Sequence, residues 1–387
     1  MTIILLFFLI TTIALSVYDS QTGDFPEVML VNNSINSQTG ESVVIIGDSE
    51  LAAKSNGGSG TKNDPYRLRA RTIESDETCI RIENTTAYFE IQGGKYEIDV
   101  DDPLDSEPVI RLRGVEHGII RDCYTSGGKF GIELLDVANI NIENCMMRKS
   151  YIGISLDMGD NCTIRDSRIF HNEIGAYLLV ATNSMIFNNS IYANTGIGFD
   201  IGFYSENNSI YQNRIGWNTE INAVDDGIDN SFSANEWSDH HSTGAYSIYG
   251  NDQSTDSSAT RLVDINAPTI VDLRDIVIDV ESTSEYITWT CSDSFPDRYE
   301  IFIDDNLEIQ DLWDGEKVTF RIDQLPEGVY DVTLNVTDAA GNTRSGIVIV
   351  TVISYMLGGI GTELVMLASG VTLVVFLVII LIVKKVL

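Results

Sequence analysis

A repeat of about 22 residues in the middle of the chain limits the possible folds more than any other feature of the sequence. The stretch "FGIELLDVANINIENC" (130–145) returns as "IGISLDMGDNCTIRDS" (152–167) and again as "IGAYLLVATNSMIFNNS" (174–190). Four glycines mark the period, at spacings of 22, 22 and 23 residues: Gly131, Gly153, Gly175 and Gly198. A unit this short cannot bury its apolar face alone, so successive copies must stack on one another.

Alignment of the copies produces columns of apolar residues. Four columns are apolar throughout: Ile132, Ile154, Ala176 and Phe199; Leu134, Leu156, Leu178 and Ile201; Ile142, Ile164, Ile186 and Ile210; Met147, Ile169, Ile191 and Ile215. Polar and apolar residues alternate between the columns, which indicates short β-strands. The sequence therefore predicts an all-β fold, a right-handed parallel β-helix whose 22-residue coils stack about 4.8 Å apart.

Polar residues follow the same period. Asn and Asp tolerate the left-handed backbone of sharp corners and bond along a stack, so two columns are predicted to be structural rather than ligand-binding: Asp122, Asn144, Asp166 and Asn188; Asn172 and Asn194. Arg121, Glu143 and Arg165 form a column of alternating charge, predicted on the outer face. Cys123 and Cys145 are also 22 apart, which suits a buried stack of thiols or a disulfide.

The chain is strongly acidic, and this balance limits its partners. Lys and Arg number 24 against 57 Asp and Glu, a formal net charge of −33, which repels nucleic acid and attracts cations. Residues 97–107 form an acidic insertion whose carboxylates are either a solvated loop or a Ca²⁺ site, and the candidate ligands are Asp99, Asp101, Asp102 and Asp105.

Two apolar segments at the ends of the chain, together with the repeat, predict its organisation. Residues 1–16 are predicted to be a signal peptide, with an uncleaved anchor as the alternative, and residues 17–43 a linker. The β-helix is predicted over 44–265 and a second β-module over 266–353. Residues 364–383 carry no charge and precede two lysines, so we expect a transmembrane helix rather than a buried core helix, with 384–387 cytoplasmic.

Two motifs flank the repeat. The opening stretch "GSGTKNDPYRL" (58–68) and the closing stretch "AVDDGIDNSFSANEWSDHHSTGAYSIYG" (223–250) resemble those of NosD-type right-handed β-helix proteins, although Glu236 and His240 depart from the family pattern. The resemblance implies the pectin-lyase-like fold and, more distantly, the namesake's role in copper maturation. Copper would need a cluster of His, Met or Cys, and His240 and His241 stand together while Met146 and Met147 lie elsewhere.

The second module looks like the immunoglobulin-like sandwich that archaeal surface proteins often carry. Its strands alternate between polar and apolar residues and are separated by turn residues. The resemblance implies that Trp289 is its core tryptophan and that Tyr330 is a corner tyrosine. Such a module is expected to act as a spacer between the β-helix and the membrane.

The leading functional hypothesis is a membrane-anchored cell-surface protein that binds glycans or other envelope components. Four aromatic residues are candidates for stacking on sugars: Tyr192, Tyr204, Tyr211 and Trp217. The alternative is a polysaccharide lyase or hydrolase, for which the candidate catalytic residues are Arg121, Arg165, Asp157, Asp160 and Asp166. Six N-x-S/T sequons agree with export, beginning at Asn32, Asn84, Asn161, Asn188, Asn207 and Asn335.

Overall fold

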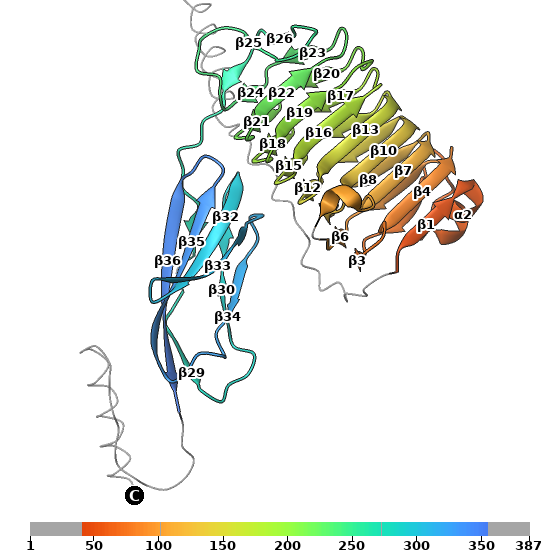
Figure 1. Ribbon diagram of the computed structural model, residues 1–387. Helices are drawn as coiled ribbons and strands as arrows, with labels where there is room; N and C mark the ends of the chain where they lie inside the picture. The colour runs from red at the N-terminus through yellow and green to blue at the C-terminus, as the bar shows by residue number, and fades with distance from the viewer. Residues whose placement is uncertain (1–40, 101, 272, 355–387) are drawn as a thin grey trace, which may run out of the picture.

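The computed structural model describes residues 41–354 except 101 and 272, and it contains two β-domains (Figure 1). The larger is a right-handed parallel β-helix, which confirms the all-β, β-helical part of the predicted fold. Within this described part of the chain, no helix has both the length and the apolar character of a membrane span. The predicted signal peptide and transmembrane segment, like Asn32 and Asp101, lie outside the described residues.

Three sheets form the walls of the β-helix. Most coils contribute one strand to each, and all neighbours pair in parallel except β25 and β26, which are antiparallel. Sheet 1 contains β1 (Val43–Ile46), β4 (Ile80–Thr85), β7 (Ile110–Val115), β10 (Phe130–Ala138), β13 (Ile152–Asp160), β16 (Ile174–Leu179), β19 (Ile197–Ile201) and β22 (Ile221–Asp225). Sheet 2 contains β2 (Tyr66–Arg69), β5 (Phe89–Gln92), β8 (Gly118–Arg121), β11 (Ile140–Glu143), β14 (Thr163–Arg165), β17 (Met185–Phe187), β20 (Ser209–Tyr211), β23 (Ser231–Ser233), β26 (Thr255–Asp256) and β25 (Tyr246–Ser247). Sheet 3 contains β3 (Thr72–Ser75), β6 (Lys95–Ile98), β9 (Tyr124–Gly127), β12 (Met146–Arg148), β15 (Arg168–Phe170), β18 (Ser190–Tyr192), β21 (Arg214–Gly216), β24 (Glu236–Trp237) and β27 (Thr260–Arg261).

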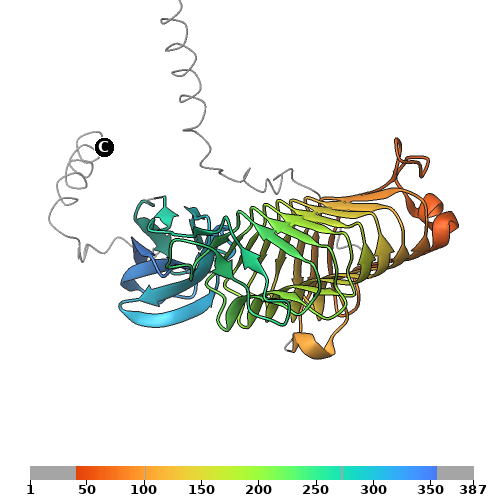
Figure 2. The ribbon, with the colours of Figure 1, turned by 90° about the horizontal axis from the view of Figure 1, so that it is seen from above.

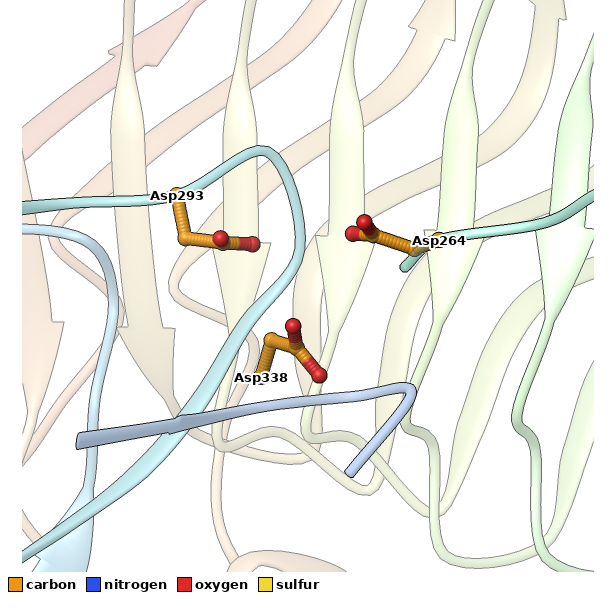
Figure 3. Close-up of side chains that lie close together, drawn as sticks. All are labelled: Asp264, Asp293 and Asp338. Carbon is orange, nitrogen blue, oxygen red and sulfur yellow. The ribbon is translucent and has the colours of Figure 1, made fainter. Parts of the chain in front are cut away.

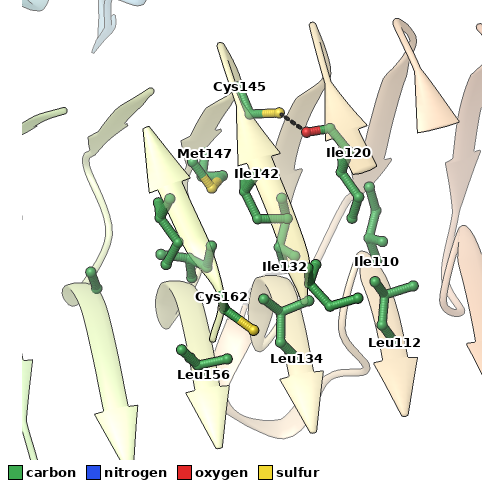
Figure 4. Packing of buried hydrophobic residues seen from close by; sticks show 14 of the residues in the cluster. Ile110, Leu112, Ile120, Ile132, Leu134, Ile142, Cys145, Met147, Leu156 and Cys162 are labelled. Carbon is green, nitrogen blue, oxygen red and sulfur yellow. Dashed lines mark hydrogen bonds between the residues drawn. The ribbon is translucent and has the colours of Figure 1, made fainter. Parts of the chain in front are cut away.

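The predicted apolar columns are the core of the β-helix. Ile132 pairs with Ile154, which pairs with Ala176, which pairs with Phe199. These side chains are fully buried, and Figure 4 shows the equivalent residues of adjacent coils packed one behind another. Each coil therefore buries its apolar face against the next, as the period required.

The repeated glycines are explained by close approach between coils. A Cβ atom on Gly131 would lie 2.5 Å from the carbonyl oxygen of Gly153, and one on Gly153 would lie 2.6 Å from that of Gly175. These are backbone atoms that cannot move aside without moving the coil. No side chain fits at these positions. Because the same close approach recurs in each coil, the spacing of the glycines equals the length of a coil.

The corner columns adopt the predicted left-handed backbone. Asp122, Asn144, Asp166 and Asn188 have φ between 50° and 56°. The Asn144 side chain donates to Asp122 at 2.7 Å and the Asn188 side chain donates to Asp166 at 2.5 Å, so the column also bonds along the axis as predicted.

Buried asparagines form ladders inside three edges of the β-helix. In each ladder the side-chain amide donates to the side-chain oxygen of the next coil, from Asn189 to Asn213 and Asn235, from Asn172 to Asn194 and Asn218, and from Asn208 to Asn230. Each of these side-chain oxygens also accepts from the backbone N–H of the asparagine one coil earlier. The second hydrogen of each side-chain amide bonds a backbone carbonyl of the preceding coil, as from Asn213 to Ile186. Every rung therefore needs an acceptor on the rung that follows it.

Two aspartates near the C-terminal end of the stack supply those acceptors, Asp225 within the closing motif and Asp256 just after it. Asp256, which is fully buried, accepts from the backbone and side-chain nitrogens of Asn235 at 2.9 Å. Asp225, also fully buried, accepts from the Asn230 side chain at 3.0 Å. A carboxylate has acceptors and no donor, so it ends a ladder without leaving an amide hydrogen unpaired.

A helix covers the first coil. Helix α2 (Gly47–Lys54) follows β1 directly and buries Leu51 against the core. Its Asp48 carboxylate accepts from the backbone nitrogens of Thr86 and Ala87 at 3.0 and 3.2 Å, and it also bonds the Thr85 hydroxyl. The apolar end of the stack is thereby closed, a feature that the sequence pattern did not predict.

The C-terminal domain has its own core and three antiparallel or mixed sheets. Its strands are β28 (Thr269–Ile270), β29 (Ile276–Asp279), β30 (Tyr286–Trp289), β31 (Cys291–Ser292), β32 (Pro296–Ile303), β33 (Asn306–Leu312), β34 (Val318–Arg321), β35 (Gly328–Asp338) and β36 (Thr343–Ile353). Trp289 is buried in this core, as predicted. The Tyr330 hydroxyl donates to the Pro326 carbonyl at 3.0 Å, which is the bond expected of a corner tyrosine.

The two domains dock through the outer face of sheet 3 (Figures 1 and 2). An aromatic cluster forms the apolar part of this junction, where Tyr192 stacks on Phe170 at 5.0 Å and meets the edge of Phe295 from the C-terminal domain at 5.2 Å. Charged pairs surround the cluster. Arg148 bonds Asp314, and His171 lies 3.0 Å from Asp297, with both β-helix side chains buried.

Candidate functional site

A groove lies on the outer face of sheet 2, with a volume of about 420 Å³. One wall is a stacked pair of rings, Tyr88 and His117, whose centroids lie 4.1 Å apart and whose planes differ by 6°. The two residues are 29 apart in sequence, but the turns that precede β5 and β8 place them on adjacent coils. The groove residues are Lys62, Pro65, Tyr88, Phe89, His117, Gly118, Ile119, Asn139, Asn141, Asn161, Thr163 and Met185.

The floor of the groove is polar and uncharged. Asn141 and Thr163 occupy equivalent positions of β11 and β14, and Asn139 and Asn161 occupy the corner beside them. Asn161 donates to Asn139 at 2.7 Å, which fixes both amides. No Asp or Glu lines the groove, although the chain has 57 of them. Apart from Lys62 and His117, the residues that line the groove carry no side chain that ionises near neutral pH, so its floor can exchange hydrogen bonds with hydroxyl groups.

The five predicted catalytic residues do not form one site. Arg165 pairs with Glu143 at 2.9 Å and with Asp166, while Arg121 pairs with Glu90, so both candidate arginines are engaged in ion pairs. Asp160 accepts from Thr182 and Asn183, and these bonds lower its pKa. Asp157 lies on sheet 1, where burial raises its pKa. The ion ladder agrees with the predicted outer-face column.

The predicted sugar-stacking residues are dispersed. Tyr192 is fully buried in the domain junction and receives a hydrogen bond from Arg168, so its prediction as an exposed platform is wrong. Tyr204 is exposed in a turn. Tyr211 stacks on Phe187 at 4.9 Å on the outer face of sheet 2, and half-buried Trp217 lies at the junction beside Phe295. The pairing of Tyr88 with His117 was not predicted from the sequence, because the acidic insertion between them interrupts the 22-residue period.

The predicted calcium ligands do not gather in the described part of the chain. Asp102 bonds the Leu104 amide at the start of the short 3-10 helix η1 (Pro103–Asp105), and Asp99 and Asp105 are exposed. Calcium binding by this loop stays a prediction.

Three other carboxylates converge at the junction between the domains (Figure 3). Asp264, Asp293 and Asp338 place one oxygen each within 4.8 Å of one another, and no other such His, Cys, Asp or Glu group exists among the described residues. Asp338 accepts both nitrogens of Asn342 at 2.8 Å, and Asp293 accepts the Phe295 amide at 2.8 Å. Burial, assisted by the two neighbouring carboxylates, raises the pKa of Asp293 to about 6.

We expect Asp293→Asn to stabilise the protein at neutral pH by on the order of 1 kcal/mol, because it removes a repelled charge and keeps an oxygen for the Phe295 amide. The pKa of Asp293 is about 6 when folded and about 3.9 when unfolded. The folded state therefore binds more protons between these values, and the wild type loses stability as the pH rises from about 4 to about 6.

Thermal unfolding across this range provides the test. Wild type and Asp293→Asn should unfold at the same temperature near pH 4, and the variant should gain stability until about pH 6 and then keep a constant advantage. Asp305→Asn, at an exposed turn residue of the same domain, is the control and should change nothing. A variant no more stable than the wild type at pH 7.5 would contradict the prediction.

The coils, sheets and ladders define a right-handed parallel β-helix protein. A family model described as "Periplasmic copper-binding protein (NosD)" matches residues 31–254, more than half of the chain. The chain therefore belongs to the NosD family, as its two motifs suggested. A search of curated proteins found no match.

Several solved structures are similar to the chain at low identity and low TM-score. An alginate lyase from Paenibacillus sp. str. FPU-7 is 12% identical over 51% of this chain and 76% of its own, with a TM-score of 0.37. Tailspike protein 2 of bacteriophage CBA120 is 10% identical over 72% and 68%, with a TM-score of 0.34. DFA-IIIase from Arthrobacter chlorophenolicus A6 is 10% identical over 49% and 62%, with a TM-score of 0.30. At this level the likeness concerns the fold alone.

The copper named in the family description does not fit the described residues. Three of the chain's four histidines are engaged: His117 stacks on Tyr88, His171 bonds Asp297, and His240 lies edge-on against Tyr246. All five cysteines are buried as free thiols, and burial raises the pKa of Cys79 to about 12. Copper favours clustered imidazole and sulfur ligands, which the described residues do not provide.

The free state of the cysteines agrees with a thiol stack rather than a disulfide. Cys123 donates to the Arg121 carbonyl at 3.2 Å and Cys145 donates to the Glu143 carbonyl at 3.3 Å. Figure 4 shows Cys145 directed toward the Ile120 carbonyl within the core.

Proposed function

We propose that this protein binds polysaccharides along the outer face of sheet 2. The observation that carries this proposal is the groove with the stacked rings of Tyr88 and His117 at one wall and an uncharged amide and hydroxyl floor. Aromatic rings pack against the apolar faces of sugars, and amides and hydroxyls both donate to and accept from sugar hydroxyls. The groove joins both kinds of surface.

A second pair of rings extends the same face. Phe187 and Tyr211 stack four strands farther along sheet 2, roughly 19 Å from Tyr88 and His117 at the usual strand spacing. On the intervening strands, the positions equivalent to Phe187 carry Glu143 and Arg165, which are paired with each other, and Asn141 and Thr163 lie two residues before them. A ligand with repeated rings can therefore meet aromatic contacts at both ends of its path and polar contacts between them, which favours a polymer over a single small molecule.

Binding fits the geometry better than catalysis. A lyase or hydrolase needs its acid and base groups on opposite sides of one bond. Arg121 and Arg165 are instead paired with Glu90 and Glu143, and Asp157 lies on a different sheet. Enzymatic turnover on polysaccharides remains the alternative that the binding assay below also measures through product release.

The proposal places the groove outside a cell. The composition supports export, with a predicted signal peptide at 1–16, sequons and a net charge of −33. We infer that residues 364–383 anchor the protein and that the C-terminal domain is an immunoglobulin-like spacer. The Tyr330 corner bond and the buried Trp289 support this assignment of the domain.

Tyr88→Ala is expected to weaken polysaccharide binding roughly tenfold, because it removes one ring of the stack and exposes His117. Binding of the full-length protein to neutral and acidic polysaccharides, with and without Ca²⁺, measures the effect. Tyr249→Ala is the control, since Tyr249 is equally aromatic, is 71% exposed and lies outside the groove. Absence of binding to every polymer, or equal binding by Tyr88→Ala, would refute the proposal.

A further inference from the structure

A second cavity, of about 280 Å³, lies between the two domains. The β-helix supplies His171, Ala193, Thr195, Trp217 and Thr219, and the C-terminal domain supplies Asp297, Leu312 and Ala339. The cavity exists only while the domains are docked, because each contributes a wall. Its size is close to the lower limit of about 300 Å³ for pockets that hold small molecules, which suits a single ring.

One wall of this junction cavity is an indole held in a fixed position. Trp217 occupies a corner with φ of 53°, its backbone nitrogen donates to Ser238 at 2.8 Å, and its ring meets the edge of Phe295 at 4.9 Å. The residue is half-buried, whereas Trp237, Trp289 and Trp313 are at most 2% exposed. A ring that enters the cavity would therefore contact a preorganised aromatic surface.

Other residues that line the cavity offer hydrogen bonds. Thr195 and Thr219 occupy equivalent positions of adjacent coils, about 4.8 Å apart. The Asp297 carboxylate lies 3.0 Å from His171 and accepts from Arg298 at 2.8 Å, so its charge is already paired while it keeps lone pairs for further donors. Hydroxyl groups of a ligand can bond both the threonine side chains and the Asp297 carboxylate.

We infer that the junction cavity binds one uncharged sugar ring, either a free monosaccharide or the terminal residue of a glycan. Trp217 would face the apolar side of the ring, and Thr195, Thr219 and Asp297 would bond its hydroxyls. An anionic ring would meet Asp297 within a chain of net charge −33, and a purely apolar ligand would make no use of the Thr219 hydroxyl or of the lone pairs that Asp297 keeps beside His171 and Arg298. This site is separate from the sheet 2 groove.

Occupancy would stabilise the docked arrangement of the domains. The ligand contacts both walls, so it binds the docked form and not the separated form. Binding of a sugar at the junction therefore favours the docked orientation of the β-helix relative to the C-terminal domain.

Acrylamide quenching of the full-length protein tests the inference, since Trp217 is the one half-buried tryptophan among four and the others are shielded. Neutral methyl glycosides should protect the fluorescence at millimolar concentration, and the matching uronic acids should protect less. Thr219→Val removes one hydroxyl with little change of shape and should weaken protection about threefold to tenfold. Thr163→Val, in the sheet 2 groove, should leave protection unchanged.

Each outcome decides the inference. Protection by methyl glycosides that Thr219→Val weakens supports it, and equal protection by oligosaccharides identifies a glycan terminus as a source. Failure of every neutral sugar to protect, equal protection of Thr219→Val, or stronger protection by uronic acids overturns it. If Thr219→Val does not fold, a rise in the unfolding temperature of the wild type with neutral sugar, absent in Trp217→Phe, gives the same decision. None of these readouts depends on the groove, so polysaccharide binding can fail while this site stands.

Discussion

Replacing Asp256 by alanine is expected to lower the free energy of unfolding of the β-helix by about 3–5 kcal/mol. The carboxylate is fully buried and accepts five or more donors, among them both nitrogens of Asn235 at 2.9 Å and the backbone nitrogens of Ala234 and Ser258 at 3.1 Å. Alanine leaves both buried nitrogens of Asn235 without this acceptor, whereas the Ala234 nitrogen keeps the Ser258 hydroxyl at 2.7 Å and both of those residues are exposed. The loss corresponds to a fall of roughly 10 °C in the unfolding temperature.

Asp256→Asn separates the two oxygens. An asparagine can keep one acceptor for Asn235, but its amide hydrogens then face the backbone nitrogens on the other side, so about half of the loss should remain. Asp252→Ala, at an exposed position four residues earlier, is the control and should cost less than about 0.5 kcal/mol. Circular dichroism during heating measures all three. An Asp256→Ala protein as stable as the control would show that the ladder needs no terminal acceptor.

Asp314→Ala is expected to destabilise the docked arrangement of the domains by about 3 kcal/mol or more. Its partner Arg148 has a side chain only 4% exposed, beneath the C-terminal domain and over the ring of Phe170. Loss of the aspartate would leave a guanidinium buried without its counter-charge. The linker around the exposed Ile265 should then become sensitive to protease, and the two domains should unfold separately.

A matched pair of variants isolates the cause. Asp311→Ala removes the partner of Lys149 at 3.6 Å, and since both side chains are well exposed it should cost less than about 1 kcal/mol. The double variant Arg148→Met with Asp314→Leu should recover most of the stability, because it removes the buried charge together with its partner. Destabilisation of the double variant to the level of Asp314→Ala would mean that packing, and not the unpaired charge, is responsible.

The core of the β-helix could be predicted because an apolar residue recurs at the same position of every coil. Ile132, Ile154 and Ala176 recur at one period, and the structure pairs them in that register. The ladder of Asn189, Asn213 and Asn235 escaped notice because the insertion in the fourth coil makes its spacing 24 and then 22. The columns of buried isoleucines contain the same insertion. Aligning the coils on those isoleucines would have placed the three asparagines in one column.

The groove and the junction could not be predicted in the same way. Tyr88 and His117 are adjacent only after the acidic insertion loops out, which no fixed period shows. Phe170 and Tyr192 stand at outward positions of sheet 3, where the alternation of strands predicts exposure, but a domain more than 100 residues later covers them. Periodicity describes how a coil meets its neighbours and contains no information on what docks against the outside.

The order of the ladders has a consequence for how such proteins can change over generations. Each asparagine of a ladder needs a hydrogen-bond acceptor from the side chain of the next coil. A closing aspartate provides that acceptor where the ladder ends. An in-frame duplication or deletion of one repeat should therefore leave both ends intact and alter only the number of coils. Related genes can lengthen or shorten the exposed face in whole steps, and with it the stretch of polymer that the face spans, without reinventing the fold.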